Sequence, residues 1–171
     1  MSLQAIADPY WSRTQSESEV VAREDPVMWG EGKPPTLGPA LSAEDVTAYE
    51  RNGFHHSQTL FSQDEAEGFL AEAKELAAEV TGPKPGVVIE PGSNAVRSLF
   101  RLHRTSDTFR AVAQDPRLVN IARQLLGSEV YVHQSRINFK PAFDGKEFFW
   151  HSDFETWHIE DGMPRMRAVS V

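Results

Sequence analysis

The hydrophobic pattern changes its period at Gly127, and this change constrains the fold more than any other feature of the sequence. Before Gly127, apolar residues recur at helical spacing in residues 62–80 and 115–127. After Gly127, runs rich in β-branched and aromatic residues are separated by turn residues, and we expect strands at 129–139, 147–151 and 166–171. A chain that places helices first and a sheet last is predicted to have an α+β fold.

The starts of the predicted helices carry capping signals. Ser62 with Glu65 three residues later forms the pattern of a capping box, and Asp115 precedes a proline at the first helical position, Pro116. A shorter helix is predicted to begin after Ser42. These signals predict where the three helices begin.

We expect one domain with three parts. Residues 1–40 mix polar residues, proline and glycine without a period and are predicted to be an irregular arm. Residues 41–127 are predicted to be mainly helical, with short strands at 54–60 and 87–89, and residues 128–171 hold the first strands of the sheet. The strand pattern is still apolar where the sequence stops, so the sheet is expected to be incomplete at its C-terminal end and to leave an open edge.

Composition excludes several classes of protein. The chain has no cysteine, so a disulfide framework, a thiol nucleophile and a thiolate metal site are excluded. Its formal net charge of -8 disfavours nucleic acid as a partner, because binding to phosphates needs a basic surface. No apolar run approaches the length of a membrane span, and the N-terminus lacks a signal-peptide pattern, so we expect a cytoplasmic protein without a membrane partner.

The predicted strand around 130–140 has one polar face. Side chains alternate along a strand, so every second residue shares this face, and its polar members are Gln134, Arg136, Asn138 and Lys140. Two cations beside two amides suit a cavity that binds carboxylates. The alternative is the solvent-facing side of an edge strand, which periodicity alone favours.

His151 and Asp153 stand two residues apart, a spacing that places both side chains on the same face of an extended backbone. Two histidines and one carboxylate form the iron-binding facial triad of non-haem oxygenases, and this pair could supply two of the three. Two alternatives remain open: a hydrogen-bonded pair at a strand end, or a local zinc site that is completed by His158.

Aromatic residues are dense around this pair. They are Phe148, Phe149, Trp150, Phe154 and Trp157. Aromatic walls around a metal exclude water and can hold a ligand cation against a ring face. The alternative is ordinary core packing.

Taken together, the segment FFWHSDFETWHIEDGMPRMRAVS at 148–170 resembles the signature of the ectoine hydroxylases, a branch of the phytanoyl-CoA dioxygenase-like iron(II)/2-oxoglutarate oxygenases. The segments YVHQSRINFK at 131–140 and NGFHHSQTLF at 52–61 support the resemblance. DPYWSR at 8–13 also resembles the family, so the likeness spans nearly the whole chain.

The resemblance implies N-terminal helices packed on a double-stranded β-helix (jelly-roll) sheet, and hydroxylation of ectoine to 5-hydroxyectoine with iron(II), 2-oxoglutarate and O2. It matches His151 and Asp153 to the first two iron ligands. It matches Gln134, Trp157 and Arg136 to positions that bind ectoine. It matches Asn138, Lys140 and Phe148 to positions that bind 2-oxoglutarate.

The same resemblance implies parts that these 171 residues do not supply. The family's distal histidine ligand, its arginine for the far carboxylate of 2-oxoglutarate and its remaining strands have no counterpart here, so these residues alone are expected to be inactive. The main alternative is a non-catalytic jelly roll that binds a ligand or another chain. An open sheet edge would also favour a homodimer.

Overall fold

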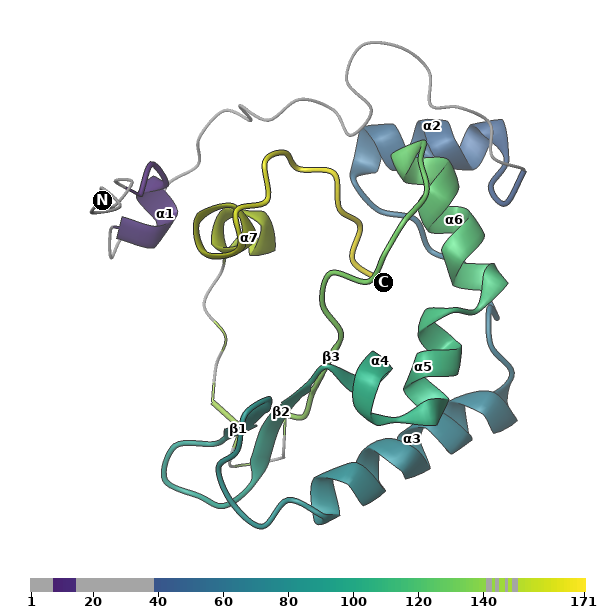
Figure 1. Ribbon diagram of the computed structural model, residues 1–171. Coiled ribbons are helices and arrows are strands. Elements are labelled where there is room, and N and C mark those ends of the chain that lie inside the picture. The colour runs from purple at the N-terminus through teal and green to yellow at the C-terminus, as the bar shows by residue number, and fades with distance from the viewer. Residues whose placement is uncertain (1–7, 15–38, 141–142, 144, 147, 149–150) are drawn as a thin grey trace.

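The computed structural model describes residues 8–14, 39–140, 143, 145–146, 148 and 151–171. Within these ranges it contains helices and one small sheet (Figure 1), which confirms the predicted α+β class. The helices are α1 Trp11–Thr14, α2 Ala43–Asn52, α3 Gln63–Ala78, α4 Leu102–Thr105, α5 Asp107–Ala113, α6 Pro116–Leu126 and α7 Asp153–Asp161. The strands are β1 Val87–Ile89, β2 Val96–Phe100 and β3 Arg136–Asn138.

The three predicted helices begin where their capping residues predict, whereas α3 ends at Ala78, before the end of the apolar pattern at 62–80. The hydroxyls of Ser42 and Ser62 each accept a backbone N–H of the first turn in a complete capping box. The Asp115 carboxylate caps α6 in the same way, directly before its proline. Gly53 and Gly127 follow α2 and α6 in the left-handed conformation, which glycine adopts without steric cost.

The sheet is antiparallel, with β2 between β1 and β3. Leu99 of β2 pairs with Val87 on one side and Ile137 on the other, and its side chain is buried. The sequence did not predict β2, because Val96–Phe100 is short and contains the charged Arg97, so its local strand signal is weak. Pairing on both sides stabilises it despite this weak local signal.

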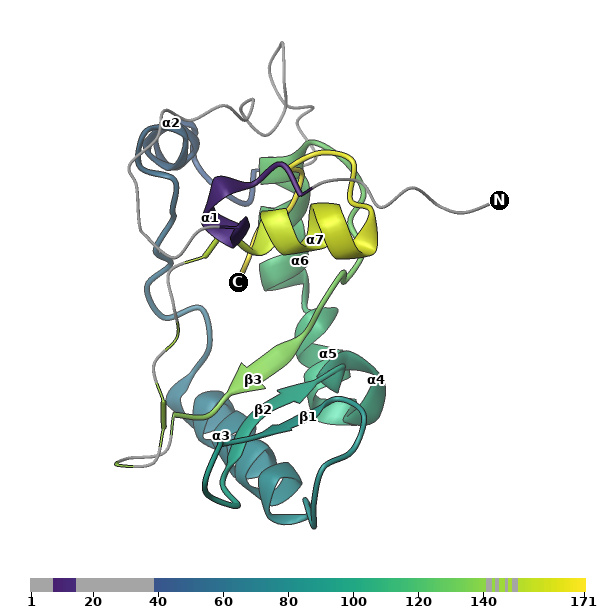
Figure 2. The same ribbon diagram turned by 90° about the vertical axis from the view of Figure 1, so that its left-hand side faces the viewer.

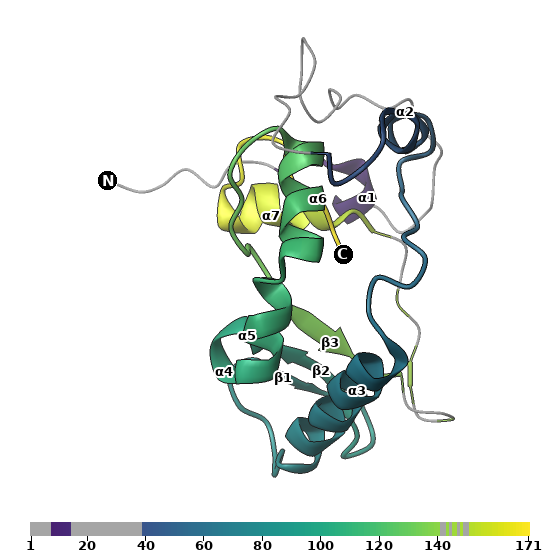
Figure 3. The ribbon, with the colours of Figure 1, turned by 90° about the vertical axis from the view of Figure 1, so that its right-hand side faces the viewer.

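Helices cover one side of the sheet. In the view of Figure 3, α3, α4 and α5 lie in front of the three strands, and Figure 2 shows the strands from the opposite side. The Ser106 hydroxyl, which caps α5, donates a hydrogen bond of 2.6 Å to Glu72 of α3. The buried apolar side chains are Leu41, Ala73, Leu99, Leu102, Leu125, Leu126 and Phe154.

Two predicted strands are absent from the structure. Residues 54–60 form a loop, in which Phe54 is exposed and Thr59 has a positive φ of 55°. Residues 166–171 are irregular, although their burial still alternates in part. A strand needs a neighbour for its backbone N–H and C=O groups, and no described strand lies alongside either segment.

Three further expectations need correction. The strand expected at 129–139 is confined to β3, whose three residues pair with β2. Of the strand expected at 147–151, the described residues Phe148 and His151 are not in a strand, and the others lie outside the described residues. The arm at 1–40, where we expected no regular element, contains α1.

The helix α7 was also missed, because aromatic content and the His-x-Asp spacing suggested an extended backbone. Local signals for it do exist in the sequence. Asp153 and Glu155 lie in its first turn, and Gly162 follows its last residue in the left-handed conformation. These signals outweigh the strand propensity of the aromatic residues.

The helices are all short relative to a bilayer. The longest, α3, has 16 residues and carries charged residues along most of its length. No helix in the described ranges is both long and apolar enough to cross a membrane.

An ion-pair network joins the first turns of α3 and α6. Arg117 donates to Glu65 at 2.6 Å and to Asp115 at 2.6 Å, and its guanidinium lies 4.3 Å from the centre of the Phe61 ring. The hydrogen bond from Arg117, followed by that from the Ser62 backbone N–H, lowers the pKa of Glu65 from 4.5 to about 2.

This network predicts an acid dependence of stability. A carboxyl group whose pKa is lower in the folded state stabilises the fold fully above its unfolded pKa, and that contribution is lost as the pH falls through the folded pKa. We therefore expect the urea concentration at the unfolding midpoint to decrease as the pH is lowered from about 4.5 to about 2. Arg117→Gln should reduce this dependence, as measured by urea unfolding at low salt. An unchanged pH profile in the variant would contradict the prediction.

Candidate metal site

His151 and Asp153 lie side by side at the start of α7. Asp153 is the first residue of the helix, and its Oδ1 lies 3.4 Å from Nε2 of His151. Two ligands at right angles on one metal ion, with bonds of about 2.0–2.2 Å, stand about 3 Å apart. The pair therefore fits two adjacent positions around a single ion. Both side chains are partly exposed, at 49% and 33%, so a ligand can reach them.

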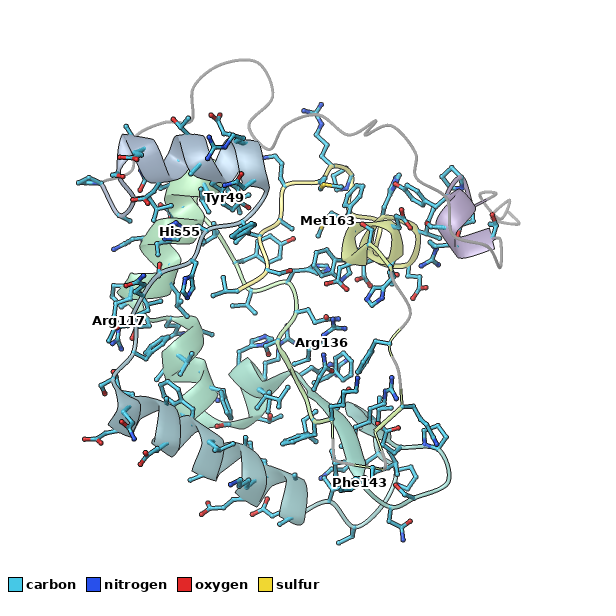
Figure 4. All side chains as sticks on the ribbon, turned by 180° about the vertical axis from the view of Figure 1, so that it is seen from behind. Tyr49, His55, Arg117, Arg136, Phe143 and Met163 are labelled. Carbon is cyan, nitrogen blue, oxygen red and sulfur yellow. The ribbon has the colours of Figure 1, made fainter. Side chains whose placement is uncertain are left out.

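Arg136 connects the sheet to this pair. It is the first residue of β3, and its Nη2 lies 3.5 Å from the same Oδ1 of Asp153. Figure 4, which labels Arg136, shows the residue between the sheet and α7. The cation fixes the carboxylate from the sheet side and offsets part of its negative charge.

The polar face predicted for residues 130–140 is present. Gln134, Arg136, Asn138 and Lys140 are exposed, whereas the residues between them are partly buried. Only Arg136 of these four has a described contact with the His-x-Asp pair. The amide oxygen of Asn138 accepts a hydrogen bond of 2.8 Å from Ser98, the residue that faces it on β2.

Trp157 faces the segment that leads into β3. Its ring meets the His133 ring edge to face, with an interplanar angle of 67° and centroids 5.0 Å apart. The partly buried His133 also lies 3.1 Å from Asp161. Phe154, on the same helix, is buried. Of these two aromatic residues of α7, Phe154 therefore belongs to the core, and Trp157 contacts the segment before β3.

Phe148 belongs to a cluster that sequence reasoning missed. The guanidinium of Arg97 lies 4.0 Å from the centre of the Phe148 ring and 3.0 Å from a carboxylate oxygen of Glu90, whose side chain is only 1% exposed. Glu90 also accepts the backbone N–H of Lys146 at 3.4 Å. The available signal was a glutamate directly after the apolar run of β1, followed by an arginine on the far side of the connection to β2.

His103, which stands between Arg101 and Arg104 in the sequence, contacts the segment that leads into β3. Its Nδ1 lies 2.5 Å from the hydroxyl of Ser135. Burial, and then the nearby charges of Arg104 and Arg110, lower the pKa of His103. It therefore supports the strand rather than forming a basic surface.

His158 does not complete a local metal site. Its Nδ1 lies 2.5 Å from the Tyr10 hydroxyl, and its ring stacks on Phe154 with centroids 5.5 Å apart. Among the residues that the structure describes, no group of three histidine, aspartate or glutamate side chains could hold a metal ion. The zinc site proposed for His151, Asp153 and His158 is therefore not formed.

An open groove of about 700 Å³ lies elsewhere, between α2, the loop after it and α6. Its lining includes Asp45, His55, His56 and Arg117, of which His55 and Arg117 are labelled in Figure 4. None of the predicted site residues lines this groove. It is separate from the His-x-Asp pair.

Comparison with known proteins gives a consistent family. A family model described as phytanoyl-CoA dioxygenase matches residues 49–171. The chain is 55% identical over 164 residues to an ectoine dioxygenase of Bordetella bronchiseptica, and the match covers 95% of this chain and 52% of the relative. An ectoine dioxygenase of Sphingopyxis alaskensis is 46% identical over 167 residues, covering 97% and 54%. The chain spans about half the length of the curated relatives it matches.

Solved structures of the Sphingopyxis alaskensis protein EctD resemble the chain. One, described with bound Fe, superposes with a TM-score of 0.76 at 45% identity and covers 94% of this chain and 56% of that one. Another, described with 2-oxoglutarate and 5-hydroxyectoine, has a TM-score of 0.77 with the same identity and coverage. The likeness confirms the predicted fold class, in which N-terminal helices pack on part of a jelly-roll sheet.

Proposed function

We propose that this chain, which belongs to the phytanoyl-CoA dioxygenase family, supplies the N-terminal half of an oxygenase that hydroxylates ectoine to 5-hydroxyectoine. The observation that carries the proposal is the His151–Asp153 pair. Its two ligand atoms stand 3.4 Å apart in a chain that is 55% identical to an ectoine dioxygenase. The proposed cofactor is iron(II), with 2-oxoglutarate and O2 as cosubstrates.

His151 and Asp153 would hold the iron(II) ion, leaving the other coordination positions to a third protein ligand, 2-oxoglutarate and O2. Bound iron(II) would supply O2 activation, in which 2-oxoglutarate is converted to succinate and CO2 while one oxygen atom enters a C–H bond of ectoine. Arg136 keeps the Asp153 carboxylate oriented from the sheet side. The position of Asp153 at the first turn of α7 also favours its negative charge, because the helix dipole is positive there.

The substrate residues we propose lie on the polar face at 130–140, on α7 and in the segment before it. Ectoine carries a delocalised amidinium cation and a carboxylate, so an aromatic face beside polar groups suits it. Trp157 and Gln134 would provide that combination, and Arg136, on the same polar face as Gln134, would belong to the same pocket. Asn138, Lys140 and Phe148 are the residues we propose for 2-oxoglutarate, with Lys140 as a point charge for a carboxylate.

Two further expectations stay predictions. The cytoplasm is the proposed location, and a second copy of the chain is a proposed partner. Neither a nucleic acid nor a membrane is proposed as a partner, since the net charge is -8 and no described helix could span a bilayer.

The proposed function is tested with a chimera, defined as residues 1–171 continued by the second half of the Sphingopyxis alaskensis ectoine dioxygenase. With iron(II), 2-oxoglutarate and O2, the chimera is expected to form 5-hydroxyectoine from ectoine and to release succinate in equal amount. Residues 1–171 alone are expected to form none, because two protein ligands hold iron(II) weakly. Nuclear magnetic resonance of the reaction mixture measures both products.

Two outcomes would contradict this account. A folded chimera that binds iron(II) but leaves ectoine unchanged would refute ectoine as the substrate. Turnover by residues 1–171 alone would show that another group within them completes the metal site, and His158 would be the first candidate to replace.

A further inference from the structure

A short segment near the N-terminus is fastened to α7. The Tyr10 hydroxyl lies 2.5 Å from Nδ1 of His158, and the two rings meet edge to face with centroids 5.7 Å apart. Arg13 donates to the hydroxyl of Thr156 at 2.8 Å and to the carboxylate of Glu160 at 3.0 Å. The partners in these contacts are 143 to 148 positions apart in the sequence.

Ser12 adds a further contact, since its hydroxyl donates to the carboxylate of Glu155 in the first turn of α7. The segment is also braced internally. Asp8 accepts hydrogen bonds from the Arg13 side chain at 2.7 Å and from the Tyr10 backbone at 3.0 Å. We call residues 8–14 the N-terminal clip. Because hydrogen bonds within the clip already restrict its side chains, their contact with α7 costs little additional conformational entropy.

The clip and the sheet side contact different residues of α7. The clip contacts Glu155, Thr156, His158 and Glu160, whereas Asp153, Trp157 and Asp161 face Arg136 and His133. The second set recurs at positions i, i+4 and i+8, which is one side of a helix. Figures 1 and 2 both show α1 beside α7. The helix is therefore enclosed between the clip and the strand that bears Arg136.

The helix α7 needs such support. It has nine residues, and helices of this length are marginal without tertiary contacts. Its N-cap residue, Ser152, makes no side-chain capping hydrogen bond, unlike the N-caps of α2 and α3. The clip bonds thus supply stabilisation that local capping does not.

We propose that the N-terminal clip is a positioning element that fixes α7, and with it Asp153 and Trp157, relative to the sheet. The proposal rests on the proposed function, because it assigns the two positioned residues to the metal and the substrate. A displacement of about 1 Å at reacting groups can cost about a hundredfold in rate. The clip would therefore act on catalysis without touching substrate.

The first test measures hydrogen exchange of the α7 amides in the 171-residue protein. We compare the double variant Tyr10→Phe/Arg13→Gln with Arg51→Gln, which removes an exposed arginine that donates a hydrogen bond to the adjacent Asn52. Exchange in α7 is expected to rise about tenfold in the double variant, while α6 stays unchanged. Unchanged exchange in α7, or an equal rise in α6, would overturn the proposal.

The second test uses the chimera and separates positioning from simple stability. In the double variant the yield of 5-hydroxyectoine per succinate is expected to fall severalfold, and Arg13→Lys is expected to retain part of the yield by keeping the charge opposite Glu160. An unchanged ratio alongside faster α7 exchange would overturn the positioning role. A wild-type chimera that is inactive on ectoine would refute the proposed function, while the exchange test would still decide whether the clip holds α7.

Discussion

In the chimera, His151→Ala is expected to abolish 5-hydroxyectoine formation and to lower iron(II) affinity by more than about a hundredfold. Removing a partner that only supports a metal ligand already costs 10- to 100-fold, so the loss of a ligand itself should cost more. Of the proposed pair, only Asp153 would then remain to bind iron(II). Iron titration and product analysis measure the two effects.

The matched control for His151→Ala is His56→Ala. His56 is an exposed histidine that lines the groove between α2 and α6, away from the pair. It is expected to leave both iron binding and turnover unchanged. Retained turnover in the His151 variant, or an equal loss in the His56 variant, would be incompatible with the proposed ligand role.

Replacing Arg97 with methionine is expected to destabilise the protein by about 3–5 kcal/mol, the usual cost of leaving a buried charge without its partner. Glu90 is 2% exposed, and Arg97 donates two hydrogen bonds to its carboxylate at 3.0 and 3.2 Å. Such a loss is a large share of the total stability of a domain of this size. Urea unfolding followed by circular dichroism measures it.

The double variant Glu90→Leu/Arg97→Met provides the control for this prediction. Because it removes both charges together, it should recover most of the stability that the single substitution loses. Recovery would show that the unpaired charge, rather than lost packing on Phe148, causes the effect. If the double variant were no more stable than Arg97→Met, the ion-pair explanation would be wrong.

The local parts of this fold could be read from the sequence, because their signals lie within a few residues. Capping boxes at Ser42 and Ser62 and the Asp115-Pro116 start define three helices correctly. β2 and the irregular ends of the expected strands could not be read in this way. Whether a segment becomes a strand depends on its neighbour, and a neighbour can be far along the chain, as Asn138 is from Ser98.

In the candidate site, too, some features could be predicted from the sequence and others could not. The spacing of His151 and Asp153 and the alternation around Arg136 were visible in the sequence, and the structure brings these three residues together. The ion pair of Glu90 with Arg97 left only a weak local signal in the sequence, and the contact of Tyr10 with His158 left none. Both depend on how separate elements pack, which periodicity does not encode.

The central claim, that this chain supplies two iron ligands of an ectoine-hydroxylating oxygenase, is tested most directly by X-ray diffraction at the iron absorption edge. The measurement uses crystals of the chimera grown with iron(II) in the absence of O2. The account predicts a single iron peak bonded to a ring nitrogen of His151 and a carboxylate oxygen of Asp153, with His158 still against Tyr10. An iron peak bonded to His158, or one remote from His151 and Asp153, would contradict it.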